Sequence, residues 1–395
     1  MGWGLGRCKV VGILERIETK IDAIMSHLLN DPGPDPDPDP DPLPSKKTVL
    51  TGQDFADAAV GRWAPKITSG DGHQYRRMGY SKAVHAIMPD GRVLVKCHPY
   101  DLHGCGVCAG VSSPMSESAL LNNVLEFGEL LVPSYVPINS SSSQRGLLYR
   151  GDDLYATYAA YYAVSGEDYG SQSKNGEGCF TLTGEPVEGM SGPYHHNKVA
   201  GYLALPPEGM QADYLVGLCG SAGAGTTSAG PNLYAVNWND GAPVAEMLVG
   251  YSLADDLVMP GWDNVTQIRG AAWMDTGDKH GVMFTGVRSI GHVWYGLRDS
   301  NDGHHDPWDG TKGYHAEDYD QGFWIFNPDD LQAGPTEWVS IRGLGWLDGV
   351  KDDFRVNHKM QVTCSHVAGR TLIGVSRGYP SSPYERTPLF IELGI

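Results

Sequence analysis

An Asp-Pro repeat near the N-terminus constrains the fold of this chain more than any other feature. From Asp31 to Pro44, every second residue is proline. Proline fixes φ and removes a backbone hydrogen-bond donor, so this segment forms neither a helix nor a sheet strand. We expect an extended polyproline II rod of roughly 45 Å, kept solvated by its aspartates, which separates the segment before it from the segment after it.

A short amphipathic helix is predicted before the rod, within residues 10–29. Its apolar positions follow the three- and four-residue spacing of a heptad seam. A helix of this length is marginal alone in water, so we expect it to pack on copies of itself or on a partner. Isoleucine at most seam positions favours a trimer. Packing back onto the rest of the chain is the alternative. The predicted oligomerisation or docking residues are Ile13, Ile17, Ile21, Ile24 and Leu28.

The remainder of the chain reads as one large all-β domain. Glycine (52 residues) and proline (26) are abundant among the 395 residues, and short apolar runs alternate with turn signals. Groups of runs recur every roughly 50–70 residues, a period typical of a solenoid or a propeller, and the mixed polar and apolar runs favour the propeller. We therefore predict a β-propeller of six or seven blades. The predicted organisation is a helix over 1–30, a rigid linker over 31–50 and a head over 51–395.

Charge and cysteine content exclude several classes of protein. The formal net charge of −18 argues against binding to nucleic acid, because no basic stripe is present to neutralise phosphates. No apolar run is long enough for a transmembrane helix, so no membrane insertion is expected. Seven cysteines over this length do not form a disulfide framework. Cys105 and Cys108 form a single C-x-x-C motif, for which a zinc site is the alternative to ordinary buried cysteines.

The densest polar stretch, residues 299–320, is predicted to be a loop between two strands and the functional face of the head. Its carboxylates suit calcium, its imidazoles suit zinc or another transition metal, and its aromatic side chains suit a sugar. A solvated loop without a ligand is the alternative. We name calcium as the one candidate cofactor and leave the metal ligands unassigned. The predicted ligand-binding residues are Asp306, Trp308, Asp309, Tyr314, His315, Asp318 and Tyr319.

No catalytic motif stands out, so no catalytic residue is predicted and the chain is expected not to be an enzyme. The glycine-rich segment Gly220–Gly230 lacks the lysine that a phosphate-binding loop needs. No H-E-x-x-H sequence occurs. Aspartates are plentiful, however, and a pair of carboxylates is sufficient for glycoside hydrolysis. A polysaccharide-acting glycoside hydrolase or lyase therefore stays as an alternative.

Two segments carry a resemblance to known proteins. Residues 313–331, which include Gln-Gly-Phe-Trp-Ile-Phe-Asn-Pro-Asp-Asp-Leu, resemble a blade edge of bacterial and phage β-propeller proteins. Residues 13–24, Ile-Leu-Glu-Arg-Ile-Glu-Thr-Lys-Ile-Asp-Ala-Ile, resemble the N-terminal anchor of tailed-phage fibre and spike proteins. The resemblance implies a virion-attached display protein and assigns no catalytic residue.

These observations together predict a non-enzymatic virion protein: a fibre, a spike or a capsid decoration protein. Its helix would attach to a capsid or tail protein, and its head would contact a host surface glycan or another virion component. The expected location is the virion surface. The alternatives are the polysaccharide-acting enzyme and a secreted, extracellular bacterial adhesion module.

Overall fold

The chain separates into two units, Met1–Lys46 and Lys47–Ile395, and nearly all described residues belong to the second. The helix predicted over 1–30 and the Asp-Pro repeat lie outside the described residues, and so do Ile13, Ile17, Ile21, Ile24 and Leu28. The computed structural model describes residues 46–66, 83–96, 105–108, 123–131, 142–151, 153–160, 178–181, 186–187, 202–211, 217–219, 231–237, 244–251, 262–307, 310, 312–348, 362–376 and 388–395.

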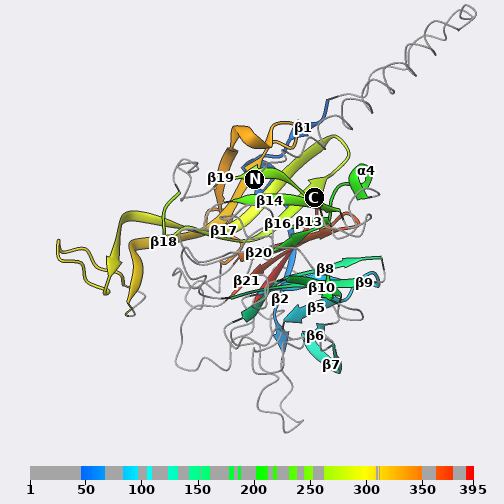
Figure 1. The fold of residues 1–395 in the computed structure, drawn as a ribbon, viewed down its shortest axis with the longest axis horizontal. Coiled ribbons are helices and arrows are strands. Elements are labelled where there is room, and N and C mark those ends of the chain that lie inside the picture. The colour runs from blue at the N-terminus through cyan, green and yellow to red at the C-terminus, as the bar shows by residue number, and fades with distance from the viewer. Residues whose placement is uncertain are drawn as a thin grey trace, which may run out of the picture. The chain divides into compact units, whose positions relative to one another are not determined.

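Strands dominate the second unit, which confirms the all-β prediction (Figure 1). Helix is confined, in the part of the chain that the structure describes, to α2 (Gly52–Ala56), α4 (Glu208–Gln211) and the 3-10 turn η4 (Leu331–Ala333). Within those same residues, no helix is long and apolar enough to cross a membrane.

The described strands form five sheets of four or five strands, which follow one another along the chain. The first sheet contains β3 (Pro65–Lys66), β7 (Asn123–Leu131), β6 (Cys105–Cys108), β5 (Val93–Lys96) and β4 (His85–Ile87), in that spatial order. The second contains β11 (Pro186–Val187), β10 (Gly178–Thr181), β9 (Asp153–Ala160) and β8 (Ser142–Arg150). The third contains β12 (Leu203–Ala204), β13 (Gly217–Cys219), β14 (Asn232–Asn237) and β15 (Val244–Gly250).

The fourth and fifth sheets recruit strands from the beginning of the unit. In the fourth, β1 (Thr48–Val49) pairs in parallel with β17, so residues 48 and 49 of the predicted linker belong to the sheet. In the fifth, β2 pairs with the last strand of the chain. The other strands of the fourth sheet are β16 (Gln267–Asp275), β17 (Lys279–Gly296), β18 (Gly313–Phe326) and β19 (Pro335–Ser340). The fifth contains β2 (Ala59–Trp63), β22 (Leu389–Leu393), β21 (Arg370–Val375) and β20 (Val362–Val367).

Apolar side chains join successive sheets face to face. One cluster joins the first and second sheets through Val84 and Leu147, and another joins the third and fourth through Leu233 and Phe284. A cluster around Phe323 joins the fourth sheet to the fifth, and Trp63 in the fifth packs with first-sheet residues. One edge strand of each sheet also contacts an edge strand of the next, β4 with β8, β8 with β12, β12 with β16, β16 with β20, and β20 with β4. The fifth sheet therefore packs against the first.

Five sheets among the described residues are fewer than the predicted six or seven blades. The prediction divided the head by a typical blade length. The fourth sheet departs from that length, because β17 has 18 residues and β18 has 14. The number of blades stays a prediction, since parts of the head lie outside the described residues.

Candidate functional site

The outer halves of β17 and β18 extend beyond the strands that flank them. β16 pairs with β17 only as far as Val287, and β19 pairs with β18 only as far as Gly322. Beyond these residues, within the described part of the chain, the two strands pair only with each other, up to the pair formed by Gly296 and Gly313. We call residues 288–321, which include the connecting loop, the arm. Figure 1 shows the arm reaching out past the other described strands, at the left of the view.

The arm corrects the predicted limits of the polar loop. The sequence predicted a loop over 299–320, but β18 begins at Gly313, so the last eight residues of that stretch are strand. Several buried positions of this segment, such as His315 and Asp320, are polar. For that reason the segment before Gln321 did not show the apolar alternation that marks a strand.

A β-bulge at Gly291 sets the register of the arm. The pairing of β17 with β18 shifts between Ile290 and Val293, and Gly291 has a φ of 77°. A Cβ atom at Gly291 would lie 2.0 Å from Oε2 of Glu317. Glycine therefore provides both the left-handed backbone and the space in which the Glu317 carboxylate accepts a hydrogen bond from the backbone N–H of His292, at 3.0 Å.

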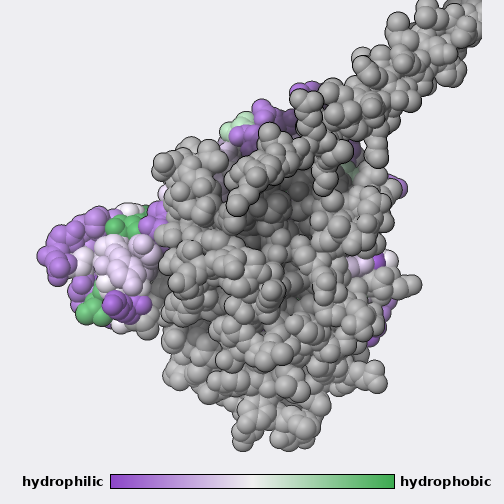
Figure 2. Space-filling view, viewed as in Figure 1, coloured by the Kyte–Doolittle hydropathy of each residue, from purple (hydrophilic) through white to green (hydrophobic). Residues whose placement is uncertain are grey.

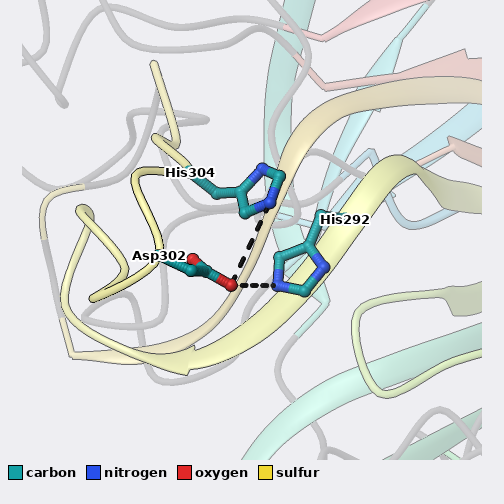
Figure 3. Close-up of side chains that lie close together, drawn as sticks. All are labelled: His292, Asp302 and His304. Carbon is teal, nitrogen blue, oxygen red and sulfur yellow. Dashed lines mark ion pairs between the residues drawn. The ribbon is translucent and has the colours of Figure 1, made fainter.

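Two imidazoles and one carboxylate converge next to the bulge (Figure 3). Nε2 of His292 lies 3.3 Å from Oδ2 of Asp302, and Nε2 of His304 lies 4.0 Å from the same oxygen. The three ligand atoms all lie within 4.8 Å of one another. The two rings stack with centroids 4.1 Å apart. His292 comes from β17, whereas Asp302 and His304 come from the connecting loop, so this cluster joins the loop to the strand.

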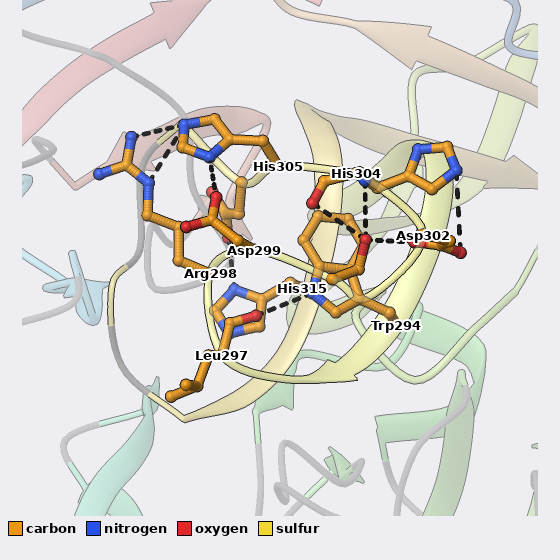
Figure 4. A network of polar contacts seen from close by, with 10 residues as sticks. Trp294, Leu297, Arg298, Asp299, Asp302, His304, His305 and His315 are labelled. Atoms are coloured by element: carbon orange, nitrogen blue, oxygen red, sulfur yellow. Dashed lines mark hydrogen bonds and ion pairs between the residues drawn. The ribbon is translucent and has the colours of Figure 1, made fainter.

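Hydrogen bonds hold the loop side of the cluster in place (Figure 4). Oγ of Ser300 accepts from the backbone N–H of His304 at 2.7 Å and donates to the Asp302 carboxylate. Nδ1 of His304 donates to the Glu317 carboxylate. The Ser300 hydrogen bond lowers the pKa of Asp302, and the His292 backbone bond, followed by the His304 side chain, lowers the pKa of Glu317. Both carboxylates are therefore held in the ionised form.

A buried polar layer lies beneath the loop. Asp306, His315 and Tyr319 are each 0% exposed. The Asp306 carboxylate accepts from Nδ1 of His315 at 2.7 Å and from the Tyr319 hydroxyl at 2.7 Å. The Trp294 ring stacks on His315, and its Nε1 donates to the Leu297 carbonyl at 2.8 Å. This layer ties the loop to both strands of the arm.

The predicted ligand-binding residues thus occupy different environments. Asp306, His315 and Tyr319 form the buried layer, where their polar atoms bond to one another. Tyr314 is partly exposed and packs edge to face on Tyr295, with ring centroids 4.9 Å apart, and Asp318 is partly exposed on β18. The remaining two, Trp308 and Asp309, lie outside the described residues.

Sequence reasoning did not select the converging cluster. Asp302, His304 and Glu317 lie within the polar stretch but were not among the predicted ligand-binding residues, and His292 lies before it in an apolar strand. A histidine after a glycine in a strand of apolar residues was the available signal. Only the register of β17 and β18 brings His292 to the loop.

Exposed apolar side chains gather on the arm. Ile290, Tyr295 and Leu297 are 43%, 62% and 64% exposed, and Val60 is the one other large apolar residue with comparable exposure in the described part of the chain. Figure 2 shows the arm as a protrusion on which hydrophobic and hydrophilic residues are mixed. An apolar group surrounded by polar residues is typical of a surface that contacts a partner.

Comparisons with known proteins identify no family for this chain. No protein-family model matches it, and no curated protein matches it. Among solved structures, the exo-inulinase from Aspergillus awamori is similar with a TM-score of 0.34 and 8% sequence identity. The match covers 84% of this chain and 63% of that one, so the chain spans less than two thirds of the exo-inulinase. Similarity at this level assigns no activity to the chain.

Proposed function

We propose that this chain is a non-enzymatic display protein whose all-β head binds a surface glycan through the arm. The observation that carries the proposal is the exposure of Ile290, Tyr295 and Leu297 on a two-stranded ribbon that extends past its own sheet. β16 and β19 do not continue alongside this ribbon, so the ribbon lacks the packing that these strands give the inner part of the hairpin. The exposed Tyr295 ring adds nothing to the core. Contact with a partner accounts for both features.

The chemistry of the arm suits a carbohydrate. An aromatic ring offers a flat apolar face to a sugar ring, and neighbouring carboxylates accept hydrogen bonds from sugar hydroxyls. Tyr295 is held by its edge-to-face contact with Tyr314, which limits the entropy lost on binding. Asp299, with its side chain 73% exposed, supplies an acceptor in the same loop.

The sheet arrangement supports a β-propeller head with five blades in place of six or seven. Five sheets follow one another among the described residues, one edge strand of each contacts that of the next, and β20 returns to contact β4. The pairing of β2 with β22 would close such a ring, because it joins the two ends of the head within one sheet. In this proposal the fourth blade carries the arm.

Attachment to a virus particle is the second part of the proposal. It rests on the heptad seam and the Asp-Pro repeat, which favour a tether to a capsid or tail protein. Deleting residues 1–44 should leave a folded, soluble head that no longer incorporates into its particle. A truncated head that still assembles would contradict the tether.

Binding to purified bacterial surface polysaccharides tests the glycan proposal. With the full chain in solution over immobilised polysaccharides, we expect Tyr295→Ala to weaken binding by roughly tenfold or more, as for a central contact residue. Val60→Ala is the matched control, because Val60 is a 57% exposed apolar residue on β2 rather than on the arm. Equal affinities for the wild type and Tyr295→Ala would rule out the arm as the contact surface.

The same preparations test the alternative of a polysaccharide-acting enzyme. Release of reducing ends from one of the polysaccharides, abolished by replacing a single aspartate or glutamate, would replace the display proposal with that alternative. Binding without turnover would support the display proposal.

A further inference from the structure

We infer that His292, Asp302 and His304 form a binding site for a divalent transition-metal ion of the zinc class. Two imidazole nitrogens and one carboxylate oxygen are a donor set that such ions prefer, whereas Ca²⁺ takes six to eight oxygen ligands. This inference is independent of the partner proposed for the arm, because it concerns how the loop is held on β17.

The distances between the three ligand atoms lie close to those that a metal would require. Ligands about 2.0–2.1 Å from a tetrahedral Zn²⁺ lie about 3.3 Å from one another. The His292 to Asp302 distance is already 3.3 Å, and the His304 to Asp302 distance is 4.0 Å. The side chains of His292 and His304 are 41% and 35% exposed. The two rings are stacked, with 22° between their planes, so side-chain rotations that unstack them would bring both nitrogens to one ion.

The hydrogen bond from His304 to Glu317 selects the tautomer that binds a metal. Nδ1 of His304 carries the proton that it donates to the Glu317 carboxylate, so in the neutral ring Nε2 presents its lone pair toward Asp302. A carboxylate on the far nitrogen of a ligating histidine is the usual outer partner of a metal-bound imidazole. Glu317 is itself fixed by the backbone N–H of His292, at 3.0 Å.

A metal ion would link all three side chains, whereas a proton links only two. Nε2 of His292 lies 3.3 Å from Oδ2 of Asp302, so a proton on that nitrogen makes a single hydrogen bond, and Nε2 of His304, at 4.0 Å, lies beyond hydrogen-bond distance of the same oxygen. A metal ion can bind all three ligand atoms, which lie within 4.8 Å of one another.

The metal would connect the loop to the strand. His292 lies on β17, and Asp302 and His304 lie within the tight turn that Ser300 closes. Three protein ligands leave a fourth tetrahedral position for water. Because β16 and β19 stop pairing with the arm at Val287 and Gly322, a metal at this point would hold the two strands of the arm together where these neighbours end.

Metal titration of the full chain tests the inference. After chelator treatment, the protein competes with a chromogenic chelator for Zn²⁺, and circular dichroism checks that each variant is folded. We expect the wild type to bind one equivalent of Zn²⁺, with an affinity at least tenfold higher than that of His292→Ala. His305→Ala is the matched control. It removes a histidine of the connecting loop that is not in the cluster, so it has as many histidines as His292→Ala does. It should bind as the wild type does.

Two further measurements separate this site from adventitious binding. Glu317→Gln keeps all three ligands but loses the charged outer partner, so it should weaken Zn²⁺ binding by about 10–100-fold. Excess Ca²⁺ should leave bound Zn²⁺ in place. Equal Zn²⁺ affinity in the wild type, His292→Ala and Glu317→Gln would overturn the inference, and displacement of Zn²⁺ by Ca²⁺ would overturn the assignment to a transition metal.

Discussion

The inner and outer halves of one hairpin, β17 with β18, are stabilised in different ways. In the inner half, Phe284 and Phe326 are 0% exposed and pack edge to face, with β16 and β19 on either side. In the outer half, Ala316 and Tyr319 still belong to the apolar cluster around Phe323, but Asp306, His315 and Tyr319 add a buried polar layer, and Tyr295 faces solvent. A two-stranded ribbon is marginally stable alone. The difference teaches that a hairpin leaving its sheet can supplement its apolar packing with specific polar contacts.

The buried polar layer also explains why the arm combines buried polar side chains with exposed apolar ones. Apolar burial is non-directional and tolerates rearrangement, whereas buried polar groups stabilise only when each has its partner. The buried layer of the arm meets this requirement, since the Asp306 carboxylate accepts two hydrogen bonds at 2.7 Å. The exposed side chains Ile290, Tyr295 and Leu297 are therefore available for the binding proposed for the arm.

The largest expected effect comes from the apolar core of the inner half. Phe284→Ala should lower the free energy of unfolding by about 3–5 kcal/mol, because it removes a fully buried ring and leaves a cavity. Tyr295→Ala on the outer half is the comparison, and it should change the free energy by less than about 0.5 kcal/mol. Denaturant unfolding of the full chain measures both. Similar losses of unfolding free energy in the two variants would contradict the view that the two halves are stabilised in different ways.

A pH effect should come from the body of the head, at His85. Burial lowers the pKa of His85 to about 4, although its nitrogens lie 2.8 Å from the Ala83 carbonyl and 3.3 Å from the Leu372 carbonyl. The unfolded chain, with a pKa near 6.5, binds this proton more readily than the folded chain does. The stabilisation is therefore complete above about pH 6.5 and is lost as the pH falls from there through 4.

The size of this loss follows from the difference between the two pKa values, and it is about 3 kcal/mol over the whole window. Unfolding experiments between pH 7 and pH 4.5 should show the decline in the wild type and a flatter curve in His85→Gln. A decline of the same slope in His85→Gln would assign the pH dependence of stability to other groups, and His85 would no longer distinguish the body of the head from the arm.

The smallest of the three effects is expected in the buried layer of the arm. Asp306→Asn replaces a buried carboxylate that accepts from His315 and Tyr319 with an amide of similar shape, and it should cost about 1–3 kcal/mol. Asp299→Asn is the control, because the Asp299 side chain is 73% exposed, and it should cost less than about 0.5 kcal/mol. Thermal unfolding compares the two variants. No difference between them would mean that the arm does not depend on its polar layer.

The sequence by itself determined the fold class and the region of interest. Local runs such as Gly322-Phe323-Trp324-Ile325-Phe326 predict strands because the backbone needs only local alternation and turn residues to form them. The polar stretch after residue 299 was predicted to be the functional face from its density of acids and aromatics, and Asp302 and His304 of the proposed metal site lie within it.

Only the tertiary structure decided which of those side chains meet. Asp306 and Asp302 are four residues apart in one polar stretch, yet one is buried and the other is exposed. His292 joins Asp302 and His304 because the bulge at Gly291 sets the register between β17 and β18. Side chains alternate between the faces of a strand, so a slip of one residue would turn His292 to the opposite face. Register depends on contacts across strands that are distant in sequence, and composition does not encode it.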